Sequence, residues 1–167
     1  VSIHGLTDEL DGVTLADVLA GVSELRARHP DTPVVIFTYY NILYSYGLKR
    51  FADEAAQRGV DAVLVVDLPL EERGELLDVL RPAGLTLVPL VAPTTGPARV
   101  RAIAEGLEDS FLYAVTVKGT TGQRASLPPE LASRLTEIKR LVSLPVVAGF
   151  GIRTPAEGAA VASHCDG

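Results

Sequence analysis

Five short apolar runs recur along the chain at nearly constant spacing, and this repeat restricts the possible fold more than any other feature. The runs begin at Pro33, Val60, Thr86, Phe111 and Pro145, so that successive starts are 27, 26, 25 and 34 residues apart. Each run is continuously apolar rather than alternating, which is typical of strands buried on both faces of a parallel sheet. We therefore expect parallel strands that are covered by helices.

Segments with the apolar period of an α-helix separate these runs. Thr14 and Asp17 form a weak capping box at the start of the first segment. Gly59 stands where a helix commonly ends, and Pro82 is expected to stop the third helix. Pro129 fits the first turn of the fifth helix. The predicted apolar stripes occupy residues 15–25, 51–56, 76–80, 100–104, 131–141 and 155–163.

A strand followed by a helix, repeated five times, requires parallel strands joined by crossover connections. A doubly wound open sheet and a (β/α)8 TIM barrel both satisfy this order. The barrel is favoured because no glycine-rich turn follows Thr38 after the first apolar run. A complete barrel needs about 250 residues. We therefore predict that residues 1–167 are a single α/β domain, the central five to six units of an incomplete barrel, with about two units missing before it and one after it.

Composition and charge argue against several classes of protein. The 15 Lys and Arg residues against 21 Asp and Glu residues give a net charge of -6 with no basic cluster, so we expect no nucleic-acid partner. No run of 18 apolar residues exists, and residues 1–10 do not resemble a signal peptide, so no membrane association is expected. The single cysteine, Cys165, fits a cytoplasmic protein and is expected to be a small buried residue.

The ends of the predicted strands are where chemistry is expected, because active sites of such barrels lie in the loops between each strand and the next helix. The longest of these loops contains Gly119 and Gly122, which favour either a ligand clamp for phosphate or a plain surface loop. Gly149 and Gly151 flank the end of the last run and indicate a second phosphate-binding turn or tight packing. The strand-end segments are Thr38–Asn41, Asp67–Pro69, Ala92–Gly96, Thr116–Arg124 and Gly149–Gly151.

Two further residues have alternative interpretations. Asp67 is either a catalytic acid or base, or a residue that caps a helix N-terminus or makes hydrogen bonds within the loop. Tyr113 either belongs to the core or presents its hydroxyl group to the barrel interior. The three histidines share no ligand spacing, so no metal site is expected.

Five segments in this order resemble the tryptophan synthase alpha chain family, and the resemblance runs from Gly12 to Gly167. The combination is specific, although no single segment is. The segments are FTYYNILYSYG (37–47), GVDAVLVVDLPLEE (59–72), LVAPTT (90–95), FLYAVTVKGTTGQR (111–124) and LPVVAGFGI (144–152).

The resemblance implies a (β/α)8 lyase of tryptophan biosynthesis that cleaves indole-3-glycerol phosphate to indole and glyceraldehyde 3-phosphate by a retro-aldol reaction. It implies an alpha2beta2 assembly with a beta chain that holds pyridoxal phosphate, and no cofactor in this chain. It implies a substrate and phosphate site in which Tyr113 has a supporting catalytic role, and a beta-chain interface. The implied substrate site comprises Phe37, Tyr113, Thr121, Gly122, Gly149, Phe150 and Gly151, and the implied interface comprises Tyr39, Asn41, Asp67 and Pro69.

The chain also departs from the family pattern. The segments that carry the family's catalytic glutamate and aspartate are not found among these residues, so we expect the chain alone to be inactive. Two alternatives stay open: another phosphate-binding barrel, such as a phosphosugar isomerase or thiamine phosphate synthase, or a non-catalytic activator of a beta chain.

Overall fold

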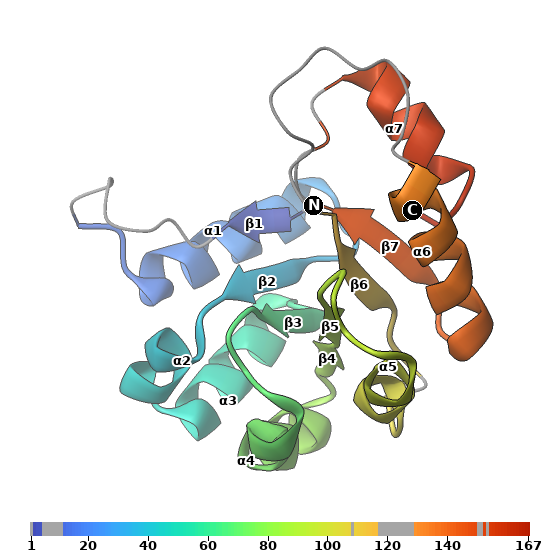
Figure 1. Ribbon diagram of the computed structural model, residues 1–167. Coiled ribbons are helices and arrows are strands. Elements are labelled where there is room, and N and C mark those ends of the chain that lie inside the picture. The colour runs from blue at the N-terminus through green and yellow to red at the C-terminus, as the bar shows by residue number, and fades with distance from the viewer. Residues whose placement is uncertain (1, 5–11, 108, 117–128, 150–151, 153) are drawn as a thin grey trace. The chain divides into compact units, whose positions relative to one another are not determined.

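The computed structural model describes residues 2–4, 12–107, 109–116, 129–149, 152 and 154–167 (Figure 1). The chain divides into two compact units, 1–87 and 88–167. Parallel strands alternate with helices along the chain, as the spacing of the apolar runs predicts. The prediction of one domain over residues 1–167 stays a prediction.

The first unit is built on a sheet with the strand order β1-β2-β3-β4. Helix α1 packs against α3, and α3 packs against α4. The buried side chains of these helices are apolar and include Phe51, Leu19 and Leu76. The elements are β1 (Ser2–His4), α1 (Leu15–Arg28), β2 (Val35–Thr38), α2 (Tyr40–Tyr46), α3 (Leu48–Arg58), β3 (Ala62–Val65), η1 (Leu70–Glu72), α4 (Arg73–Leu80), η2 (Arg81–Ala83) and β4 (Thr86–Val88).

The second unit is built on a sheet with the strand order β5-β6-β7, and α6 packs beside β7 (Figure 1). Its core joins Leu112 of β6, Val146 of β7 and Leu135 of α6. Two backbone hydrogen bonds join the last two residues of the chain to β7. The Asp166 N–H donates to the Val146 carbonyl (2.7 Å), and the Ala148 N–H donates to the Gly167 carbonyl (2.9 Å). The elements are β5 (Leu90–Val91), α5 (Pro97–Ala104), β6 (Leu112–Val115), α6 (Pro129–Leu141), β7 (Val146–Gly149) and α7 (Pro155–Ala162).

The helix ends predicted from local sequence signals are confirmed. Thr14 and Asp17 form the capping box of α1, and Gly59 ends α3 in the left-handed region with φ of 88°. Helix α4 ends before Pro82, which lies in the short helix η2. A second capping box, formed by Thr154 and Glu157 before α7, was not predicted, although it has the same spacing.

Three elements differ from the sequence-based expectation. The run that begins at Thr86 is not one strand, because it is interrupted at Pro89 and contributes β4 to one sheet and β5 to the other. Proline has no N–H for a sheet hydrogen bond, which explains the break. The segment after Thr38 was expected to be a loop, but α2 begins at Tyr40. Strand β1 lies in a stretch for which no strand was predicted.

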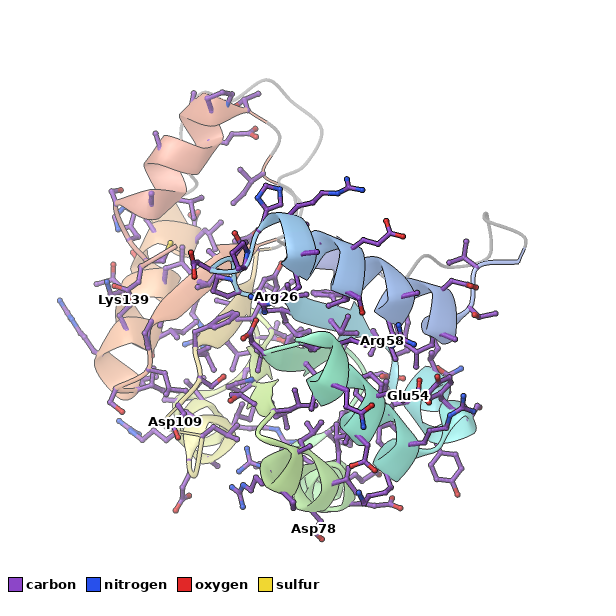
Figure 2. The ribbon with its side chains drawn as sticks, turned by 180° about the vertical axis from the view of Figure 1, so that it is seen from behind. Arg26, Glu54, Arg58, Asp78, Asp109 and Lys139 are labelled. Carbon is purple, nitrogen blue, oxygen red and sulfur yellow. The ribbon has the colours of Figure 1, made fainter. Side chains whose placement is uncertain are left out.

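Arg26 of α1, labelled in Figure 2, holds together the segments that lead into β2 and β3. Its guanidinium group donates hydrogen bonds to the carbonyls of Pro30 (2.7 Å) and Gly59 (2.5 Å) and to the Asp61 carboxylate (2.6 Å). Asp61 also accepts a hydrogen bond from the Val34 N–H at 2.7 Å. These bonds fix the start of β2 next to that of β3, and so help to set the register of the two strands. Among the described residues, no helix is both long and apolar enough to cross a bilayer.

Candidate functional site

Tyr113 and Gly149 meet at the carboxyl-terminal half of the second sheet. Tyr113 lies on β6 opposite Val147, two residues before Gly149 on β7. A Cβ atom added to Gly149 would lie 1.8 Å from the Tyr113 hydroxyl oxygen and 2.3 Å from the ring carbon that carries it. The Tyr113 ring therefore occupies the space that any side chain at position 149 would need. Gly149 is required here for close approach.

The Tyr113 hydroxyl group is suited to donating a hydrogen bond. Its side chain is half-buried, and burial raises the pKa of the phenol above its usual value of 10.0. A phenol with a raised pKa stays protonated at neutral pH, so it donates a hydrogen bond without carrying charge. This property fits a residue that orients a hydroxyl or phosphate oxygen of a ligand.

Thr116 is a residue at this site whose contribution the sequence did not reveal. It follows β6, and it is buried with 4% of its surface exposed. Its hydroxyl group donates a hydrogen bond of 2.9 Å to the Gly149 carbonyl. In the sequence, Thr116 is only the first residue of a strand-end segment, because nothing local indicates a partner 33 residues away.

The segment after β5 is closed by its own threonine. Thr95 accepts a hydrogen bond from the Ala92 N–H through its hydroxyl oxygen (3.0 Å), and its own N–H donates to the Ala92 carbonyl (3.0 Å). The Arg134 guanidinium group of α6 donates to the Thr95 carbonyl. This strand-end turn is therefore fixed to the helix that follows the next strand.

In the first unit, Asp67 joins the ends of β2 and β3. It follows β3, and its carboxylate accepts a hydrogen bond of 2.7 Å from the N–H of Tyr40, the first residue of α2. The residue before that helix, Tyr39, makes no capping hydrogen bond through its side chain. Asp67 therefore caps α2 from the segment after β3, although it is not the N-cap residue of the helix that follows it.

The residues of the implied beta-chain interface lie around this cap. Tyr39, Asn41, Asp67 and Pro69 are all exposed, and Tyr39 keeps 41% of its surface accessible. Beside them, Tyr40 donates a hydrogen bond of 3.0 Å to the Glu75 carboxylate of α4. Burial first, and then this hydrogen bond, raise the pKa of the Tyr40 phenol.

The remaining candidates are divided between described and undescribed parts of the chain. Phe37 lies on β2 in register with Leu64 of β3 and is half-buried. Four candidates lie outside the described residues, and for these the sequence prediction stands alone: Thr121, Gly122, Phe150 and Gly151.

Within the described ranges, no three His, Cys, Asp or Glu side chains gather closely enough to hold a metal ion. A shallow groove of about 340 Å³ is lined by α6 and His164 rather than by strand ends. Cys165 is buried, as predicted, and its thiol donates a hydrogen bond to the Val161 carbonyl (3.2 Å).

Comparison with known proteins gives one consistent result. A profile of the family described as tryptophan synthase alpha chain matches residues 7–167. A protein of that name from Geobacter sp. (strain M21) is 44% identical over 156 residues, which are 93% of this chain and 58% of that protein. Another, from Novosphingobium aromaticivorans, is 42% identical over the same shares of both chains. The chain thus spans less than two thirds of the length of these relatives.

Solved structures agree with this result. The tryptophan synthase alpha chain from Legionella pneumophila subsp. pneumophila superposes with a TM-score of 0.85 and 31% identity over 99% of this chain and 65% of that chain. A chain of the tryptophan synthase a2b2 complex from Pyrococcus furiosus superposes with a TM-score of 0.83 and 35% identity, over 92% of this chain and 61% of that chain. The predicted fold class, an α/β chain of the incomplete (β/α)8 barrel type, is confirmed.

Proposed function

The chain belongs to the tryptophan synthase alpha chain family, and from this membership we propose that it serves the retro-aldol cleavage of indole-3-glycerol phosphate. In this reaction the bond between the indole ring and the glycerol carbon breaks. The hydroxyl group on that carbon loses its proton and becomes the aldehyde of glyceraldehyde 3-phosphate, while the ring carbon takes up a proton. The family's glutamate and aspartate, which are not found among these residues, would move these protons. This chain's own residues would bind and orient the substrate.

The packing of Tyr113 against Gly149 carries the proposal. The phenol of Tyr113 reaches from β6 to Gly149, the last residue of β7, where the family resemblance implies a phosphate site. Backbone N–H groups in a glycine-rich turn are suited to phosphate because nothing blocks its approach. We propose that Tyr113 donates to the glycerol side of the substrate, and that Gly122, Gly149 and Gly151 with Phe150 hold the phosphate.

We also propose that the end of the first unit around Asp67 binds a beta chain. The supporting observation is that Tyr39, Asn41 and Pro69 leave their side chains exposed around a helix end that is already capped. The Asp67 carboxylate is therefore engaged by this chain's own backbone and would shape the surface rather than act as a catalytic base. Pyridoxal phosphate would belong to the partner, and a cytoplasmic location stays a prediction.

Calorimetric titration of the chain with indole-3-glycerol phosphate tests the substrate proposal. We expect binding that Tyr113→Phe weakens by about 3–10-fold, the effect of one hydrogen bond. Tyr46→Phe is the matched control, because the Tyr46 hydroxyl donates to Glu54 of the neighbouring helix α3 at 2.7 Å, away from the strand ends. Equal losses in both variants, or no binding by the parent chain, would contradict the proposal.

A second assay separates the catalytic function from that of an activator. The chain is mixed with a purified beta chain, and release of indole and stimulation of the beta reaction are measured separately. Stimulation without indole release, abolished by Tyr39→Ala and retained in Tyr46→Phe, would assign the activator function.

A further inference from the structure

The Gly149 carbonyl receives two hydrogen bonds from one residue. The Thr116 N–H donates at 2.8 Å and the Thr116 hydroxyl group donates at 2.9 Å. The first bond continues the parallel ladder in which Val115 is paired with Gly149. The second bond is not part of any ladder, so it depends on the side chain at position 116.

Together these bonds fix the orientation of the Gly149 peptide group. A carbonyl oxygen has two lone pairs, and here both receive donors from within the chain. Thr116 is one of only two buried polar residues in the described part of the chain, the other being Thr38. Because Thr116 is almost fully buried, loss of its donor is costly.

The orientation of Gly149 matters because Tyr113 lies directly against it. Its hydroxyl oxygen lies only 1.8 Å from the place of a Cβ atom at position 149, so a shift of this backbone toward the ring would displace the ring. A rotation of the Gly149 peptide group would therefore change where the Tyr113 hydroxyl group points. Thr116 is thus linked to Tyr113 through one glycine.

We propose that Thr116 is a positioning residue for Tyr113, which it acts on by clamping the Gly149 carbonyl through its side-chain hydroxyl group. The proposal deepens the proposed function, on which it rests, because Tyr113 is the residue there that meets the glycerol side of the substrate. Thr116 itself does not need to touch the substrate.

Threonine is suited to this clamp. Its branched Cβ restricts χ1, which holds the hydroxyl group in one direction. Valine has nearly the same shape without the donor, and serine keeps the donor without the methyl group. The pair Thr116→Val and Thr116→Ser therefore separates the hydrogen bond from the packing.

Two measurements on the 167-residue chain test the proposal. The first is the ionisation of Tyr113, measured by ultraviolet absorbance as a function of pH. The contribution of Tyr113 is the difference between the titration of each variant and that of the same variant carrying Tyr113→Phe. The second is the affinity for indole-3-glycerol phosphate by calorimetry. Thr38→Val is the matched control. Thr38 is equally buried at 3% exposure, yet its hydroxyl group reaches only the neighbouring Tyr39 carbonyl, at 3.4 Å.

Burial raises the pKa of Tyr113, so we expect a ring that is less firmly held in Thr116→Val to be more exposed and to ionise at lower pH. We also expect this variant to bind substrate about 3–10-fold more weakly, the effect of one lost hydrogen bond. Thr116→Ser restores both values, and Thr38→Val changes neither. If Thr116→Val does not fold, Thr116→Ala replaces it in the comparison with Thr116→Ser. Alanine also lacks the hydroxyl donor, but it places no methyl group against the Gly149 carbonyl.

An unchanged Tyr113 ionisation in Thr116→Val, or an equal shift in Thr38→Val, overturns the proposal. The ionisation measurement needs no ligand, so the two failures remain distinguishable. A chain that binds no substrate, but whose Tyr113 ionisation depends on the Thr116 hydroxyl group, contradicts the proposed function and leaves the clamp in place.

Discussion

Replacement of Gly149 by alanine tests the closest contact at the candidate site. The added methyl carbon would lie 1.8 Å from the Tyr113 hydroxyl oxygen, whereas optimal contacts between non-bonded atoms are about 3.5–4.0 Å. The ring would therefore have to move by roughly 2 Å. Overpacking of this kind costs about 1–3 kcal/mol, and we expect the upper part of that range because two ring carbons and the hydroxyl oxygen of Tyr113 overlap with the added methyl group.

The loss of stability caused by Gly149→Ala should depend on Tyr113, and a double-mutant cycle measures that dependence. Tyr113→Ala alone removes a half-buried ring and destabilises the fold. Once the ring is gone, Gly149→Ala meets no obstacle, so we expect the double variant to be more stable than the sum of the single effects by about 2 kcal/mol. Urea unfolding followed by circular dichroism gives the four free energies of unfolding.

Gly158→Ala serves as the control within the same unit. Gly158 lies in α7, and a Cβ atom there would be 3.8 Å from its nearest neighbour, an ordinary contact. Alanine at this helical position should be neutral or stabilise by about 0.5–1 kcal/mol. Additivity of the Gly149 and Tyr113 effects within about 0.5 kcal/mol, or a Gly149→Ala variant as stable as the parent, would refute the reasoning.

Three further predictions follow from the cap of α2, the end of β7 and the missing carboxylates. Asp67→Ala removes the acceptor of the Tyr40 N–H and should lower the free energy of unfolding by about 1 kcal/mol, with a smaller loss for Asp67→Asn, by urea unfolding. Hydrogen bonds from Lys139 and then from the Val146 N–H lower the pKa of Asp166 below 3.8; this stabilisation is complete above about pH 4 and is lost as the pH falls through the lowered value. Acid unfolding should therefore be flatter in Asp166→Asn, and equal profiles would disprove the link. Finally, the chain alone should release no indole above background, since general acid–base groups contribute about 10²–10⁴-fold each; turnover by the purified chain would require another base.

The sequence by itself determined those elements whose signals lie within a few residues of one another. The capping box of Thr14 and Asp17, the end of α3 at Gly59 and the continuous apolar runs all act through neighbouring residues. Such signals operate before any tertiary contact forms, so the pattern alone indicates them. The alternation of strand and helix then follows, and with it the ends of strands as the place for the candidate site.

Only the tertiary structure decided which residues that are distant in the sequence contact one another. The N–H of Tyr40, where α2 begins, is capped by Asp67, which is 27 residues away, and no side chain just before Tyr40 provides a cap. The sequence indicates Gly149 only as a glycine at a strand end, whereas the structure shows that Tyr113 fills the space beside it and that Thr116 holds its carbonyl. These pairs are set by the register of neighbouring strands, and register depends on the packing of whole sheet faces rather than on any short stretch of chain.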